Sequence, residues 1–157
     1  MFDIVLYRPE IPPNTGNIIR LCAATGATLH LIEPLGFRLD DRNLRRAGLD
    51  YHEFANVRRH ATLGAWRAEL GRRTVHVLSR HAEQSLYTVR FNPGDALLFG
   101  SETQGLPTAA RAELPSANAL RIPMREGIRS LNLANAVAIT LYEALRQCCL
   151  ANGTLDI

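Results

Sequence analysis

Short runs of β-branched and aromatic residues recur along the chain, and segments with helical periodicity separate them. The runs predict strands at residues 3–7 (DIVLY), 28–32 (TLHLI), 74–79 (TVHVLS), 95–100 (DALLFG) and 120–123. Strands that alternate with helices usually form a parallel sheet that is covered on both faces. We therefore expect an α/β fold with a mostly parallel sheet and helices on both of its faces, in one domain that spans residues 1–157.

The segments between the strands predict helices and carry residues that are typical of helix ends. These helices run over residues 18–25, 61–70 and 107–114, from Asp40 or Asp41 to Ala47, and from Ser130 or Asn132 to about Leu150. Gly26 and Gly48 each stand directly after a predicted helix, where glycine readily adopts the left-handed conformation that ends it. The run Asn14–Asn17 (NTGN) predicts a turn before the first helix.

The composition is that of an ordinary globular domain, with 157 residues of which 46% are hydrophobic and 21% charged. No apolar run approaches the ~20 residues that a membrane span requires. The N-terminus, MFDIVLYRPE, lacks a basic lead and predicts a strand rather than a secretory signal. Three cysteines without C-x-x-C spacing argue against a disulfide framework or a zinc site. We therefore expect a cytoplasmic protein with no membrane partner.

All 18 basic residues are arginines, because the chain contains no lysine. This excludes mechanisms that need a lysine, such as a Schiff base or the lysine of a phosphate-binding P-loop. None of the 11 glycines forms a G-x-G pattern, so the dinucleotide-binding fingerprint is missing as well. The net charge of +3 permits a nucleic-acid partner without demonstrating one, and the planar guanidinium of arginine suits phosphate.

Three loops of unusual composition follow predicted strands, at residues 9–17, 100–105 and 123–131. Ligands of parallel sheets usually bind beyond the carboxyl ends of the strands, so these loops are where a site is expected. Arg20, close to the first loop, is either a clamp for a phosphate or ribose, or a solvated arginine on a capped helix. Gly100 and Gly105 indicate either a close approach of a ligand or a tight turn.

Three motifs occur in order along the chain: NTGNIIR from residue 14, FGSETQGL from residue 99, and IPM from residue 122 with SLNLANAV from residue 130. Together they resemble the three motifs of the SPOUT superfamily of RNA methyltransferases, and the resemblance extends over essentially the whole chain. The stretches IVLYRPEIPPNTGNIIRLCA and LRRAGLDYHEF are similar to one subgroup of it. This subgroup consists of the bare catalytic domain and comprises the tRNA (cytidine/uridine-34-2′-O)-methyltransferases.

The resemblance implies a fold and an activity that hydrophobic patterning does not predict. The fold is a SPOUT domain with a deep trefoil knot at its C-terminal end. The activity is transfer of a methyl group from S-adenosylmethionine to the ribose 2′-hydroxyl of the wobble nucleotide 34 of tRNA, and it requires no metal because the sulfonium methyl is already electrophilic. By resemblance, the cofactor-binding residues are Leu78, Gly100, Glu102, Gly105, Ile122, Met124, Ser130, Leu131, Asn132 and Asn135. Glu102 either contacts the cofactor or is structural and ties the loop of the second motif.

The resemblance also implies residues for catalysis and for the RNA. Arg20 is the residue expected to serve catalysis, with Asn14 and Asn17 shaping its pocket; it either orients a phosphate or hydroxyl or acts as a base. A homodimer is expected to bind the anticodon stem-loop of tRNA, with Tyr142 facing the partner subunit or packing in the core. The candidate phosphate contacts are Arg45, Arg46, Arg58, Arg59, Arg125 and Arg129.

Two other functions remain open at the level of sequence. One is a SPOUT 2′-O-methyltransferase that acts on another RNA site, in ribosomal RNA or elsewhere in tRNA. The other is a non-catalytic RNA-binding dimer, which loss of Arg20 or of the third motif would indicate; both are present. The sequence does not distinguish C34 from U34 as the target.

Overall fold

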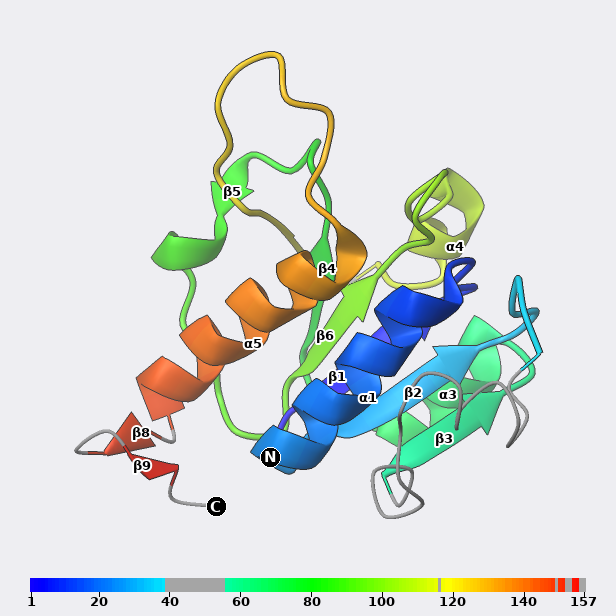
Figure 1. Cartoon of the computed structure of the whole chain (residues 1–157), viewed down its shortest axis with the longest axis horizontal. Coiled ribbons are helices and arrows are strands. Elements are labelled where there is room, and N and C mark those ends of the chain that lie inside the picture. Colours follow the sequence, from blue (N-terminus) through cyan, green and yellow to red (C-terminus); the bar gives the residue numbers. More distant parts are fainter. Residues whose placement is uncertain (39–55, 116, 149, 152–153, 156–157) are drawn as a thin grey trace.

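The computed structural model describes residues 1–38, 56–115, 117–148, 150–151 and 154–155. Its centre is a seven-stranded sheet in the order β3-β2-β1-β6-β4-β7-β5, and all neighbouring strands are parallel (Figure 1). The strands are β1 (Asp3–Tyr7), β2 (Thr28–Ile32), β3 (Val57–His60), β4 (Val75–Leu78), β5 (Gln84–Ser85), β6 (Ala96–Phe99) and β7 (Asn118–Arg121). A separate antiparallel pair, β8 (Leu150–Ala151) and β9 (Thr154–Leu155), follows near the C-terminus.

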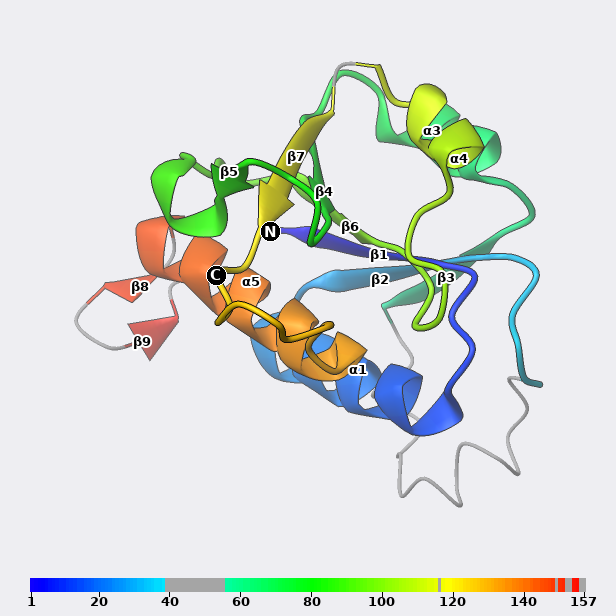
Figure 2. The same ribbon diagram turned by 90° about the horizontal axis from the view of Figure 1, so that it is seen from above.

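Helices cover both faces of the sheet, as the alternation of strands and helices predicts (Figure 2). One face carries α1 (Pro12–Thr25) and α5 (Leu133–Cys148), and the other carries α3 (Leu63–Leu70) and α4 (Thr108–Ala112). A short 3₁₀ helix, η2 (Leu86–Thr88), follows β5. Each face buries its own apolar cluster, which is the reason β1 and β6 are buried along their whole length. No helix in the described part of the chain is long and apolar enough to cross a bilayer.

The predicted strands are confirmed within one or two residues at each end, whereas the start of the first helix is wrong. Helix α1 begins at Pro12, so Asn14–Asn17 lies inside the helix and does not form a turn before it. Proline is favoured in the first turn because its missing N–H has no helical acceptor there and its fixed φ already suits a helix. The predicted end is confirmed, since Gly26 follows α1 with a φ of +67°.

The other helices differ from prediction mainly at their ends. Helix α3 begins after Thr62, whose side chain accepts a hydrogen bond from the Ala65 N–H (3.1 Å). Helix α4 is shorter than predicted, and α5 ends at Cys148. The helix predicted from Asp40 or Asp41 to Ala47 lies outside the described residues.

Strand β3 was not predicted, because two arginines interrupt its apolar pattern. It lies at the edge of the sheet, where it pairs with β2 alone and leaves Arg58 and Arg59 exposed. Edge strands tolerate charged residues, which also prevent further strand pairing. These two arginines therefore belong to a sheet edge.

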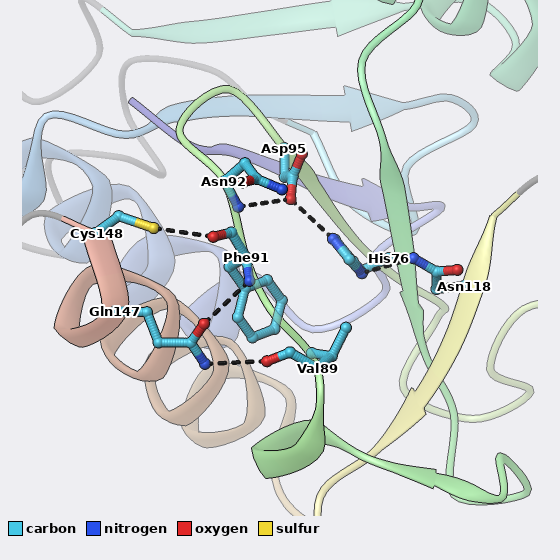
Figure 3. A network of polar contacts seen from close by, with 8 residues as sticks. All are labelled: His76, Val89, Phe91, Asn92, Asp95, Asn118, Gln147 and Cys148. Atoms are coloured by element: carbon cyan, nitrogen blue, oxygen red, sulfur yellow. Dashed lines mark hydrogen bonds and ion pairs between the residues drawn. The ribbon is translucent and has the colours of Figure 1, made fainter.

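A chain of polar contacts joins the end of α5 to the segment before β6 (Figure 3). Gln147 accepts from the Phe91 N–H (3.0 Å) and donates to the Val89 carbonyl (3.2 Å). Further along, His76 Nε2 donates to Asp95 (2.9 Å), while His76 Nδ1 accepts from Asn118 (3.4 Å). The segment between β5 and β6 is therefore fixed both to α5 and to the centre of the sheet.

Candidate functional site

A cavity of about 450 Å³ opens beyond the carboxyl ends of β4, β6 and β7. All three motif segments contribute to its wall, because parallel strands bring their carboxyl ends to one edge of the sheet. Nine of the ten residues predicted to bind the cofactor line it: Leu78, Gly100, Glu102, Gly105, Ile122, Met124, Ser130, Leu131 and Asn132. The tenth, Asn135, is exposed in the first turn of α5 and does not line the cavity.

A network of hydrogen bonds joins the three motif segments beside the cavity. The Glu102 carboxylate accepts from the backbone N–H of Glu10 (2.8 Å) and of Ile11 (3.1 Å) and from the Asn14 side-chain amide (3.1 Å). The Asn14 carbonyl oxygen then accepts from the Asn132 amide (2.9 Å). Because a carboxylate can only accept, the amide group of Asn14 has to face Glu102, and this sets the direction of the whole network.

The same network bonds two N–H groups just before α1 and the first N–H groups of α5. Glu102 places a negative charge beside the start of α1, where the helix dipole favours an anion. Asn132 caps α5, because its side-chain oxygen accepts from the backbone N–H of Ala134 (2.9 Å) and of Asn135 (3.3 Å). Of the two residues predicted to begin this helix, Asn132 is therefore the cap.

Both glycines of the second motif have a steric reason to be glycine. A Cβ on Gly100 would lie 2.0 Å from the Gly105 carbonyl carbon and 2.1 Å from the Leu106 nitrogen, so the loop closes tightly on itself. The paired backbone groups of Ser101 and Gly105 complete this turn. Gly105 has a φ of +68°, and a Cβ there would meet no atom within 4 Å, so its backbone lies open to the cavity.

The residues predicted for catalysis lie partly apart from the cavity. Asn14 is buried and lines it. Asn17 and Arg20 are exposed on later turns of α1 and do not line the cavity. Arg20 follows Asn14 by six residues, which corresponds to about 9 Å along a helix axis.

The residues predicted to contact RNA are dispersed. Arg129 lines the cavity, and Arg125 is exposed in the same segment. Arg58 and Arg59 lie on the edge strand β3, where Arg59 pairs with Glu33. Tyr142 is 46% exposed on α5. Arg45 and Arg46 lie outside the described residues.

Sequence reasoning missed one wall of the cavity, formed by Ser79, Arg80 and His81 after β4. The rule that ligands bind beyond strand ends applies to this position as it does to the other three loops. These residues went unnoticed because no glycine or proline marks the segment.

The lining combines apolar side chains with exposed backbone and a few charges. Leu78, Phe99, Leu106 and Ile122 offer apolar surface, and Arg80 and Arg129 place positive charge at the cavity. Its size and mixed lining suit a small organic ligand with a flat apolar part and polar ends. Among the described residues, no group of three or more His, Cys, Asp or Glu side chains is arranged to hold a metal ion.

Comparison with known sequences identifies relatives over most of the chain. Residues 1–142 match the model of the SpoU rRNA methylase family. Over 138 residues the chain is 56% identical to a protein of Polaromonas sp. named tRNA (cytidine(34)-2′-O)-methyltransferase, covering 85% of this chain and 83% of that protein. A protein of the same name from Escherichia coli K12 is 52% identical over 134 residues, covering 85% of each chain.

Solved structures are similar over an even larger share of the chain. One, described as giving structural insights into the 2-OH methylation of C/U34 on tRNA, has a TM-score of 0.86 and 49% identity, covering 94% of this chain and 95% of that one. The SpoU methyltransferase AviRb from Streptomyces viridochromogenes, in complex with the cofactor AdoMet, has a TM-score of 0.76 and 30% identity. This likeness covers 92% of the present chain and 57% of AviRb.

Proposed function

This chain belongs to the SpoU rRNA methylase family, and from that premise we propose that it transfers a methyl group from S-adenosylmethionine to the ribose 2′-hydroxyl of nucleotide 34 of tRNA. The observation that carries the proposal is the cavity to which all three motif segments contribute. Relatives named for cytidine 34 of tRNA, at 52–56% identity, favour this target over ribosomal RNA.

The cavity suits S-adenosylmethionine in size and chemistry. Leu78, Ile122 and Leu131 provide apolar surface for the adenine ring, and the open backbone at Gly105 provides polar groups for its edge. The segment between Met124 and Asn132 borders the remainder of the cavity and is the expected place for the methionine part. The AdoMet-bound relative supports use of this cofactor.

Once bound, the cofactor supplies an electrophilic methyl group, so the protein has to align the ribose hydroxyl with it and help the hydroxyl lose its proton. We assign the first of these tasks to Arg20, whose guanidinium is too weak an acid to serve readily as a base. An exposed arginine on α1 can hold a phosphate or hydroxyl of an RNA that lies across this helix. Asn14 and Asn17 shape the surface between Arg20 and the cavity.

We further propose that two copies of the chain form the tRNA site. Two exposed apolar side chains line the cavity, Ile11 (43% exposed) and Leu131 (36%). Two more lie in the segment before α5 and on α5 itself, Ile128 (56%) and Tyr142 (46%). A symmetric dimer would bury this surface on both subunits. The anticodon stem-loop would then contact arginines of both, namely Arg45, Arg46, Arg58, Arg59, Arg125 and Arg129.

For the fold, we propose that the C-terminal part of the chain is threaded as a deep trefoil knot. Two observations support it: α5 is hydrogen-bonded through Gln147 to the segment before β6 (Figure 3), and β7 pairs between β4 and β5. The C-terminal end of α5 therefore lies beside the segment that connects β4 to β6. A crystal structure in which the C-terminal part of the chain threads no loop would overturn the proposed knot.

The function is tested with purified protein, methyl-labelled S-adenosylmethionine and tRNA isolated from a strain that lacks the 34 modification. We expect label at the 2′-oxygen of nucleotide 34, located by mass spectrometry of nuclease fragments. The matched control is the same tRNA with a 2′-deoxynucleotide at position 34, which should take up no label there.

Each other outcome of this experiment contradicts part of the proposal. Label at another tRNA position, or in ribosomal RNA alone, would replace the substrate and keep the chemistry. Tight binding of tRNA and cofactor without any transfer would indicate a non-catalytic RNA-binding protein.

A further inference from the structure

We propose that Arg80 is a positioning residue that holds the segment of residues 124–131 against the cofactor cavity. This inference rests on the proposed function in one respect, the identity of the ligand as S-adenosylmethionine. The closing of the segment itself is a property of the free protein. It can therefore be measured whether or not the methyl-transfer reaction is as proposed.

The segment in question has few other attachments along its length. It leaves β7 after Arg121 and reaches the Asn132 cap of α5, and residues 125–132 are all exposed. Within it, the Ile128 N–H donates to the Arg125 carbonyl (3.3 Å), and Gly127 has a φ of +81°. These contacts shape a turn but do not tie the middle of the segment to the sheet.

Arg80 supplies a tie at this point. Its Nη1 donates to the Arg129 carbonyl (3.0 Å), and its Nε donates to His81 Nε2 (3.0 Å). The His81 N–H in turn donates to the Ser79 hydroxyl (3.2 Å), which fixes the turn that carries both side chains. The guanidinium is thus held by its own segment of the cavity wall and bonds the backbone of the neighbouring segment (Figure 1 shows the two segments side by side above α5).

The contact joins these two segments of the cavity wall. Arg80, His81 and Arg129 all line the cavity, so releasing the Arg129 carbonyl would let the segment move away from the ligand. The bonded atom of Arg129 belongs to its backbone, so its side chain is not needed for the tie. A protein that must first close a mobile segment loses affinity in proportion to the fraction of molecules that are open.

The experiment measures two properties for each variant. One is the Kd of S-adenosylhomocysteine from calorimetry without tRNA, and the other is the rate of limited trypsin cleavage after Arg125 and Arg129 in the absence of any ligand. The variants are Arg80→Ala and Arg80→Lys. Arg72→Ala is the matched control, because Arg72 is exposed, distant from the cavity, and carries the same charge.

For Arg80→Ala we expect roughly tenfold weaker binding, the effect of losing one charge-assisted hydrogen bond at an exposed site. Trypsin should cleave the segment several-fold faster, with the melting temperature unchanged. In turnover, KM for S-adenosylmethionine should rise while kcat at saturation stays close to that of the wild type. Arg80→Lys should recover part of both effects, since an ammonium reaches a carbonyl but cannot also bond His81. Arg72→Ala should match the wild type.

Three results would overturn the inference. Equal cleavage rates in Arg80→Ala and wild type would show that Arg80 does not hold the segment. Weaker binding at an unchanged cleavage rate would assign Arg80 a direct contact with the ligand instead. Faster cleavage with unchanged Kd would show that the segment does not govern binding. If the wild type binds no S-adenosylhomocysteine, the proposed function fails, and the cleavage rates still decide whether Arg80 is the tie.

Discussion

Replacing Glu102 with alanine tests whether the three motif segments depend on one another. The carboxylate accepts three hydrogen bonds, from the N–H groups of Glu10 and Ile11 and from the Asn14 amide. Hydrogen bonds to a charged group contribute about 1.5–3 kcal/mol each. Water can replace the carboxylate at the exposed Ile11 contact, so the contributions do not simply add.

We therefore expect Glu102→Ala to lower the free energy of unfolding by about 2–4 kcal/mol. For a domain of this length, such a change lowers Tm by roughly 4–16 °C. Urea unfolding followed by circular dichroism measures the stability. Calorimetry with S-adenosylhomocysteine should show weaker binding as well, because Glu102 holds the loop that carries Gly100 and Gly105 to the cavity.

Two comparisons sharpen this test. Glu102→Gln keeps one oxygen but turns an amide group toward N–H donors, so it should recover less than half of the stability. Glu83→Ala removes an exposed acid and should stay within about 0.5 kcal/mol of the wild type. The reasoning is refuted if Glu102→Ala unfolds as the wild type does. Weaker ligand binding at unchanged stability would mean that Glu102 contacts the ligand instead of supporting α1.

Four further predictions follow from the same structure. Arg20→Ala should stay folded, keep its affinity for S-adenosylmethionine and lose roughly 10²-fold in methyl transfer, the scale of a positioned catalytic group. Near-normal turnover would contradict a catalytic role for Arg20. Gly100→Ala should abolish ligand binding in calorimetry, because its Cβ would lie 2.0 Å from the backbone of Gly105. At Gly127 a Cβ meets open space but the φ is +81°, so Gly127→Ala should lower the free energy of unfolding in urea by only about 1 kcal/mol. Burial lowers the pKa of His60, which is hydrogen-bonded to His30, so the neutral form is favoured in the folded state. The stability that His60 contributes is complete above the unfolded pKa of about 6.5 and declines below it. The free energy of unfolding should therefore fall between pH 7.5 and 5.5, and it should fall less in His60→Gln. Light scattering at micromolar concentration should give the mass of a dimer, and an active monomer would contradict the shared tRNA site.

Local sequence was sufficient for most of the sheet. β1 and β2 coincide with their predicted ranges, because a β-branched and apolar run between turn residues is already a buried strand of a parallel sheet. The three motifs identified the family, which the match over residues 1–142 confirms. The carboxyl ends of the strands identified where a cavity would form, since the loops that leave parallel strands gather at this edge of the sheet.

Element ends and edges required the structure. The start of α1 was misplaced because Asn14–Asn17 has the composition of a turn, whereas the segment before the helix is held by Glu102, 92 and 91 residues from Glu10 and Ile11, respectively. Strand β3 was missed because its pairing with β2 comes from tertiary contacts and its own residues do not favour it. In both cases the partner is distant in the sequence, so local sequence preferences do not predict it.

The sequence by itself determined the composition of the site: which strands end in glycine, asparagine or glutamate, and which family combines these motifs. Only the tertiary structure decided how these residues are joined. It directs Asn14 toward both Glu102 and Asn132, and it bonds Arg80 to the backbone of Arg129 at the cavity. A sequence specifies how many donors and acceptors each residue has, but the choice among distant partners is made when the packed sheet brings particular loops to one edge.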